Sequence, residues 1–124
     1  MVCIREDKIV INDYIENDPL SEENLDKTLA TVNRFRLSLP NKSIWLYSGY
    51  DYQKVMRQLP NLATKENYNM YKRQQIIKQC TVMVDGRYID SQRNPSKKWA
   101  GSDNQRIIDT IKSLEQNKVV LYCN

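Results

Sequence analysis

The hydrophobic pattern of the first half of the chain predicts a strand, a helix and a second strand. Lys8–Ile15 is rich in β-branched residues and predicts the first strand. A turn follows at Asp18-Pro19, after which apolar residues recur at spacings of three and four between Leu25 and Leu39. This spacing predicts one apolar stripe on an amphipathic helix, with Ser21 as its N-cap and Pro40 at its end.

Two short apolar runs predict buried strands, and the segments around them are less regular. Ser43–Ser48 and Thr81–Val84 are continuously apolar, which is typical of strands covered on both faces. We expect short helices at 50–59 and 73–80, a polar loop at 60–72, an irregular loop at 90–104, an ambiguous segment at 106–114 and a terminal strand at 119–123.

This order of elements predicts an α/β fold with a mainly parallel sheet of about four to five strands. A length of 124 residues predicts a single domain, 1–124. Ligands of such sheets bind outside the carboxyl ends of the strands. Candidate ligand-binding residues there are Glu16–Asp18, Ser48-Gly49-Tyr50 and Asp85-Gly86-Arg87, although ordinary strand-end turns would give the same pattern.

The amino-acid composition limits the kinds of catalytic and metal-binding sites that the chain can form. The sequence has no histidine, which excludes catalytic triads and zinc sites built on imidazole. Its three cysteines, Cys3, Cys80 and Cys123, are far apart, which disfavours a disulfide framework or a closed metal site. No apolar run is long enough for a transmembrane helix, so we expect a cytoplasmic protein that does not engage membranes.

The excess positive charge of +4 lies in the second half of the chain. Residues 65–106 contain nine basic and four acidic side chains, whereas residues 1–64 contain eight and nine. A basic face of this kind attracts an acidic protein surface or nucleic acid. A solvated surface without a partner is an equally plausible interpretation.

Four blocks of sequence resemble one known family. They are DPLSEENLDKTL, PNKSIWLYSGYDYQKVM, TVMVDGRYID and KKWAGSDNQRIIDTIKSL, and they occur in the family's order. The blocks are similar to the second half of the activating enzymes of anaerobic ribonucleoside-triphosphate reductase, which are radical S-adenosylmethionine proteins. The resemblance covers residues 16–124 and implies part of a partial (β/α) barrel, with residues 1–15 as a segment outside the family pattern.

The resemblance also implies a cofactor site, but this sequence differs from the family in the motifs that form it. The family binds a [4Fe–4S] cluster through a CxxxCxxC loop, and Cys3, Cys80 and Cys123 cannot form such a loop. The family's Gly-Gly-acidic-Pro motif aligns with Glu16-Asn17-Asp18-Pro19, in which both glycines are replaced. The cofactor-binding residues carried over are Asp18, Ser48, Gly49 and Asp85. We nevertheless expect neither a cluster nor S-adenosylmethionine to bind.

Two classes of function follow from these features. The first is a truncated, activase-like protein-binding module without catalytic residues, which acts as an inhibitor or decoy such as a phage or mobile element encodes. The second is the family's glycyl-radical activase, active only if the missing half is supplied in trans. A nucleic-acid-binding protein using residues 65–106 is a further alternative.

Partner-binding candidates lie in the basic segment and combine cationic, aromatic and amide side chains, a composition typical of binding hot spots. They are Arg87, Tyr88, Arg93, Lys97, Lys98, Trp99, Asn104, Gln105 and Arg106. A structural alternative is that this loop holds itself to the sheet, through an ion pair such as Arg106–Asp85 and a tryptophan lid.

A sheet that lacks the family's first strands would have an exposed edge, which invites pairing with another chain. We expect residues 1–7 to fold back over that edge as a covering strand, with Val2 and Ile4 alternating against Cys3 and Arg5. If they do not, we expect a homodimer across the edge.

Overall fold

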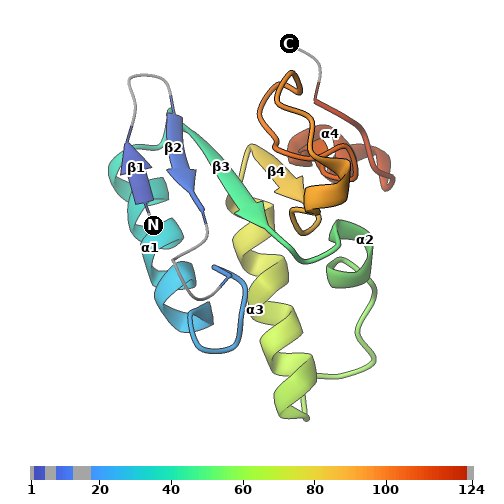
Figure 1. Cartoon of the computed structure of the whole chain (residues 1–124). Helices are drawn as coiled ribbons and strands as arrows, with labels where there is room; N and C mark the ends of the chain where they lie inside the picture. Colours follow the sequence, from blue (N-terminus) through green and yellow to red (C-terminus); the bar gives the residue numbers. More distant parts are fainter. Residues whose placement is uncertain (1, 5–7, 13–17, 123–124) are drawn as a thin grey trace.

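A five-stranded sheet in the order β1-β2-β3-β4-β5 organises the computed structural model, which describes residues 2–4, 8–12 and 18–122. The strands are β1 (Val2–Ile4), β2 (Lys8–Ile11), β3 (Ser43–Ser48), β4 (Val82–Asp85) and β5 (Arg106–Asp109). The three central strands are parallel, and β1 and β5 pair antiparallel at the two edges (Figure 1). The carboxyl ends of β2, β3 and β4 therefore meet at one end of the sheet.

Helices cover one face of this sheet, and a long loop covers part of the other. The helices are α1 (Leu25–Ser38), α2 (Tyr52–Val55), α3 (Lys65–Gln79) and α4 (Thr110–Gln116), with one 3-10 turn at Asp90–Gln92. Figure 1 shows α1 and α3 running side by side against the sheet. Alternate strand residues divide between the two faces, so that Ile44 and Leu46 pack under the helices while Trp45 packs on the opposite face.

The amphipathic helix is confirmed, but its predicted N-cap is wrong. Of the predicted stripe, Leu25 and Val32 are buried along α1 and the other members are partly buried against the core, while Thr28 is buried although the stripe does not include it. Two turns precede the helix, because the backbone amides of Ser21 and Asn24 donate to the carbonyls of Asp18 and Ser21. Asn24 therefore takes the N-cap position, and the Ser21 hydroxyl is buried without a hydrogen-bond partner.

The polar segment 60–72 is not a loop throughout, because α3 begins at Lys65. Thr64 caps it by accepting a hydrogen bond from the Asn67 backbone amide at 3.1 Å. Most of the first two turns of α3 face solvent, so the sequence shows little apolar periodicity there. The ambiguous segment 106–114 contains both structures, β5 and then α4, with Asp109 capping the helix through the Lys112 backbone amide at 2.9 Å.

The C-terminal strand predicted at 119–123 is wrong for the residues that the structure describes. A single bridge joins Leu121 to Ile108, flanked by backbone hydrogen bonds from the Asp109 amide to the Val120 carbonyl and from the Tyr122 amide to the Ile107 carbonyl, both at 2.8 Å. The Tyr122 ring packs against Trp45. Cys123 lies outside the described residues. The last segment thus pairs briefly with β5 without forming a regular strand, and its Tyr122 ring covers part of the sheet's outer face.

The fold is α/β as predicted, with an open sheet of five strands whose three central strands are parallel, and a barrel is not confirmed. The expected covering strand is present, because β1 pairs with β2 along Val2↔Ile11 and Ile4↔Ile9. The condition for the expected homodimer, an uncovered β2 edge, is therefore not met. Residues 5–7 and 13–17, and with them the end of the predicted strand 8–15, lie outside the described residues. In the part of the chain that the structure describes, no helix has the length and apolar character needed to cross a membrane.

Candidate functional site

Asp18 is bonded to the end of β3, at the carboxyl edge of the sheet. Its Oδ1 accepts hydrogen bonds from the Ser48 hydroxyl at 2.8 Å and the Leu20 amide at 2.9 Å. Its Oδ2 accepts from the Gly49 amide at 2.6 Å, and a Cβ at Gly49 would lie 3.3 Å from that oxygen. Three of the residues carried over from the family are thus brought together. Their polar groups, however, are bonded to one another.

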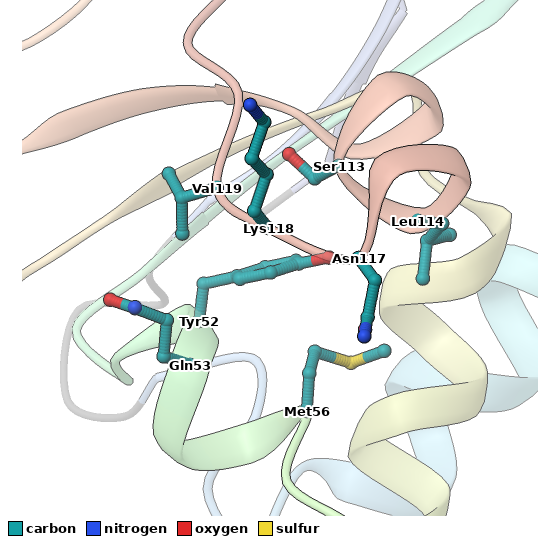
Figure 2. A pocket seen from close by; sticks show the side chains of 8 residues that line it. All are labelled: Tyr52, Gln53, Met56, Ser113, Leu114, Asn117, Lys118 and Val119. Atoms are coloured by element: carbon teal, nitrogen blue, oxygen red, sulfur yellow. The ribbon is translucent and has the colours of Figure 1, made fainter.

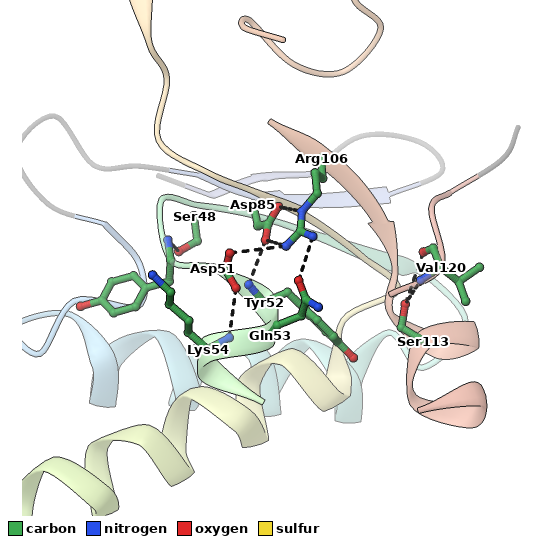
Figure 3. A network of polar contacts seen from close by, with 10 residues as sticks. Ser48, Asp51, Tyr52, Gln53, Lys54, Asp85, Arg106, Ser113 and Val120 are labelled. Atoms are coloured by element: carbon green, nitrogen blue, oxygen red, sulfur yellow. Dashed lines mark hydrogen bonds and ion pairs between the residues drawn. The ribbon is translucent and has the colours of Figure 1, made fainter. Parts of the chain in front are cut away.

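Asp85, the fourth of those residues, is buried in an ion pair with Arg106. The guanidinium donates through Nε to Oδ1 at 3.0 Å and through NH2 to Oδ2 at 2.6 Å, a two-bond arrangement that fixes both groups (Figure 3). The Asp85 Oδ2 also accepts from the Tyr52 amide at 2.9 Å. Hydrogen bonding to Asp85 raises the pKa of Arg106. Asp85 therefore holds together β4, β5 and the start of α2.

Arg106 continues this network to two residues that the sequence analysis did not select. Its NH1 donates to Gln53 Oε1 at 3.1 Å, and its NH2 lies 3.7 Å from Asp51 Oδ2. Asp51 also caps α2 by accepting from the Lys54 amide at 3.0 Å. An acidic residue at the start of a helix is a recognisable capping signal, but the helix predicted at 50–59 begins too early to place Asp51 at the N-cap position.

Amide side chains fix the loop 86–105 to itself and to the end of β4. Gln105 Oε1 accepts from the amides of Gly101 and Ser102 at 3.0 and 3.1 Å, and its Nε2 donates to the Gly86 carbonyl at 3.1 Å. Asn104 Nδ2 donates to the Arg87 carbonyl at 2.8 Å. Gly86 has a φ of 95°, a left-handed conformation that glycine adopts without strain.

An aromatic cluster holds the same loop over the outer face of the sheet. The Trp99 ring lies 5.3 Å from both Trp45 and Tyr122, measured between ring centroids. Trp99 takes a φ of 67°, which a non-glycine residue adopts only when its surroundings compensate. Both features of the structural alternative, the Arg106–Asp85 pair and the tryptophan lid, are therefore present in the structure.

Most basic residues of 65–106 fall into two groups. In the first, Lys65 pairs with Glu22 and Lys72 with Asp26, each at 2.6 Å, while Arg73 is buried and donates to the Leu20 carbonyl at 2.7 Å. Lys97 belongs to this group too, because its ammonium donates to the carbonyls of Asp103 and Gln105 at 2.9 and 2.6 Å. The second group is exposed on the loop.

That exposed group combines charge with one aromatic ring, and we call it the cationic loop surface: Arg87, Tyr88, Arg93 and Lys98. The predicted partner residues Lys97, Trp99, Asn104 and Gln105 hold the loop in place from within, and Arg106 pairs with Asp85 at the start of β5. These contacts form only in the folded loop, so the sequence alone does not separate the supporting residues from the exposed ones.

Cys80, the one cysteine whose side chain the structure describes, does not fit a cluster ligand. It is buried beneath the helices, and its thiol donates to the Ile76 carbonyl at 3.2 Å. Burial raises its pKa to about 12, which disfavours the thiolate that iron requires. Among the described residues there is no group of three cysteine, histidine or acidic side chains that could hold a metal.

The chain is similar to known proteins over most of its length. It is 32% identical over 88 residues to the anaerobic ribonucleoside-triphosphate reductase-activating protein of Escherichia coli K12, covering 71% of this chain and 48% of that protein. It is 33% identical over 90 residues to the protein of that name from Vibrio cholerae, and the match covers 73% of this chain and 49% of that protein. It is 31% identical over 91 residues to the protein of that name from Enterobacteria phage T4, and the match covers 73% of this chain and 47% of that protein.

These matches cover only part of each relative, and they point to the same family as the matching family model. The chain spans about half the length of the curated relatives it matches. No solved structure matches. The sequence model of the family described as "4Fe-4S single cluster domain" matches residues 16–108, which include the strand ends at Asp18, Ser48 and Asp85 and the loop 86–105. The chain belongs to this 4Fe-4S single cluster domain family, together with relatives named as anaerobic ribonucleoside-triphosphate reductase-activating proteins.

Proposed function

We propose that this chain is a protein-binding module that docks on an anaerobic ribonucleoside-triphosphate reductase through the cationic loop surface. The names of its relatives support the reductase as the partner. In this role the chain occupies the site of a cluster-bearing activating protein and acts as an inhibitor or decoy. Residues 1–124 perform no radical chemistry themselves.

The observation that carries this proposal is the way the loop 86–105 is held. A long loop without regular structure is usually either functional or mobile. Here an ion pair, four amide contacts and a tryptophan fix it, while Arg87, Tyr88, Arg93 and Lys98 remain exposed. A loop that is already ordered loses little entropy when a partner binds it, so its exposed groups can contribute fully to affinity.

The first prediction tests the surface by charge reversal. We expect the triple variant Arg87→Glu, Arg93→Glu, Lys98→Glu to bind the reductase at least about tenfold more weakly, because like charges across an interface repel. Lys97 is left unchanged since its ammonium holds the loop together. Titration calorimetry with purified reductase measures the affinity.

A matched control shows whether the affinity depends on where the charges are reversed or only on the net charge. The variant Arg34→Glu, Arg57→Glu, Lys112→Glu makes the same change in net charge at exposed positions outside the loop. It should bind the reductase about as tightly as the parent. Equal weakening in both variants would show that only net charge matters and would contradict the proposed surface.

Nucleic acid is the alternative partner for the same cations, and salt dependence distinguishes the two. Contacts to phosphates release counterions, so affinity for an oligonucleotide falls steeply and log-linearly with salt. Binding to a protein through Tyr88 and a few cations weakens less. A steep salt dependence with a single-stranded oligonucleotide, together with no binding to the reductase, would favour the nucleic-acid function.

The family's activase is the second candidate function, and the carboxyl edge of the sheet favours it. Asp18, Ser48 and Gly49 lie together where the family would bind S-adenosylmethionine. The carboxylates of Asp18 and Asp85 are nevertheless engaged by the chain's own donors. The cluster would have to come from residues other than 1–124, because Cys80 is unsuited and the sequence has no closely spaced cysteines.

The second prediction therefore concerns iron. We expect anaerobic reconstitution of residues 1–124 with iron and sulfide to leave no stable cluster, since a cubane cluster requires several thiolates within reach of one another. Iron analysis and the absorption spectrum provide the measurement. About four irons per chain with the charge-transfer absorption of a cubane cluster would contradict this expectation.

A further inference from the structure

One aromatic ring of the loop 86–105 is exposed, and it is packed on the loop's own backbone. Tyr88 is 47% exposed, whereas the Trp99 ring is half-buried against Trp45. A Cβ at Gly101 would lie 3.1 Å from two carbon atoms of the Tyr88 ring, so the ring packs directly on the backbone at that glycine. The Tyr88 hydroxyl donates to Asp90 Oδ1 at 3.0 Å. These two contacts fix the orientation of the exposed ring before a partner arrives.

Cationic side chains lie beside this ring. Arg87 precedes it in the chain, and Arg93 forms a β-bridge with Ser102, next to the glycine under the ring. Desolvation and the hydrogen bond within the loop raise the pKa of Tyr88, and the positive charge of Arg93 opposes them, which places that guanidinium near the hydroxyl. Ile89, which follows the ring in the chain, is 38% exposed. The loop thus presents apolar groups with cations around them.

The hollow between α2 and α4 is separate from this surface. Figure 2 shows a half-open groove of about 210 Å³ there, in which the exposed side chains of Asn117 and Lys118 point apart. None of the residues that line it belongs to the loop 86–105. Contact through the cationic loop surface is therefore made by side chains that project from the loop, and Tyr88 is the aromatic one among them.

We infer that Tyr88 is the anchor of the cationic loop surface, and that its partner is an acidic protein surface with an apolar pocket for the ring, an inference that rests on the proposed function. Tyrosine and arginine are over-represented among the few residues that carry most of the binding energy of an interface. A ring whose orientation is already fixed loses little entropy on binding. Carboxylates around the partner's pocket complement Arg87 and Arg93.

An acidic protein surface fits this arrangement better than a nucleic acid does. The carboxylate of Asp90 lies beside the Tyr88 hydroxyl, and Asp103 is exposed on the same loop. A nucleic-acid strand carries a negative charge at every phosphate, so a base stacked on the ring would bring phosphates toward these carboxylates. A folded protein can direct its carboxylates at Arg87 and Arg93 and leave Asp90 facing water.

Tyrosine substitutions test the anchor, with titration calorimetry against the purified reductase as the measurement. We expect Tyr88→Ala to weaken binding about thirtyfold, as the loss of a central aromatic anchor does. Tyr88→Phe should weaken it by at most about twofold, because the hydroxyl is bonded within the loop. Tyr68→Ala is the matched control, since Tyr68 is 49% exposed but lies on α3, and it should bind like the parent.

Gly101 is a positioning residue in this scheme, and a double-mutant cycle tests it. Its backbone is not left-handed, so a side chain there acts on the Tyr88 ring rather than through backbone strain. Gly101→Val should weaken reductase binding about fivefold in the parent and cause no further loss in the Tyr88→Ala background. If the valine variant does not fold, Gly101→Ala replaces it, with the same expectation in the Tyr88→Ala background.

The outcomes distinguish this inference from the proposed function. Parental affinity of Tyr88→Ala, together with weak binding of the charge-reversal variant, would overturn the anchor and leave the proposed function standing. A parent that does not bind the reductase would overturn both. A loss from Gly101→Val that persists without the Tyr88 ring would show that the glycine does not act through it. Binding of a single-stranded oligonucleotide that depends on Tyr88 would overturn the acidic protein partner.

Discussion

The Arg106→Leu variant should lose about 3 kcal/mol of unfolding free energy, because it leaves the Asp85 carboxylate buried without its cation. Asp85 is 2% exposed, and Arg106 supplies two of its hydrogen bonds, at 3.0 and 2.6 Å. Removing one member of a buried pair costs far more than the pair itself contributes. Urea unfolding of the variant and the parent measures the difference.

Two further variants show whether the cost arises from the stranded charge. Arg34→Leu removes an exposed arginine of α1 and should change stability by less than about 0.5 kcal/mol. The double variant Asp85→Asn, Arg106→Leu should be more stable than the sum of the two single changes predicts, because no buried charge remains. Strict additivity of the two substitutions would contradict the assigned role of the pair.

The Arg106–Asp85 pair also shows what the sequence could and could not predict. The two residues lie 21 positions apart, and a pair between them was one of two interpretations of the loop composition. The pairing of β4 with β5 accounts for this ion pair, since it places Asp85 opposite Arg106. The antiparallel direction of β5 could not be predicted, because residues 106–114 fit a strand and a helix equally well.

Elements with continuous or periodic apolar patterns were predictable, and elements stabilised by polar contacts were not. β3 and the apolar stripe of α1 follow directly from the sequence, because burial alone determines them. The first turns of α3 depend on the Thr64 cap and on ion pairs such as Lys72–Asp26, whose partner lies 46 residues away. Such contacts form only in the folded chain, so local sequence does not show them.

The same distinction applies to the candidate site. The strand-end rule located Asp18, Ser48, Gly49 and Asp85, and three of these do meet. It could not show that their polar groups would be bonded to one another, because this depends on how Leu20 and Tyr52 approach the carboxylates. For the basic segment, composition located the charge, and only the fold separates Lys97, which supports the loop, from the exposed Lys98.

Trp99 is expected to be the residue whose loss most disorders the loop 86–105. Its ring contacts Trp45 and Tyr122 and closes the outer face of the sheet. We expect Trp99→Ala to lower the unfolding free energy by about 2 kcal/mol, less than for a fully buried tryptophan because Trp99 is half-buried. Hydrogen exchange of the Asn94 amide, which donates to the Gly101 carbonyl at 2.9 Å, should become faster.

The backbone at Trp99 separates the loss of the ring from the strain of its conformation. With a φ of 67°, alanine keeps the left-handed strain, whereas glycine relieves it. Trp99→Gly should therefore be more stable than Trp99→Ala by about 1 kcal/mol, although both lack the ring. Trp99→Phe preserves part of the aromatic packing and should keep the Asn94 amide protected. If the glycine variant is instead the least stable of the three, the left-handed backbone at position 99 is not a source of strain that the aromatic packing has to offset. Unchanged exchange of the Asn94 amide in Trp99→Ala would show that the ion pair and amide contacts alone hold the loop.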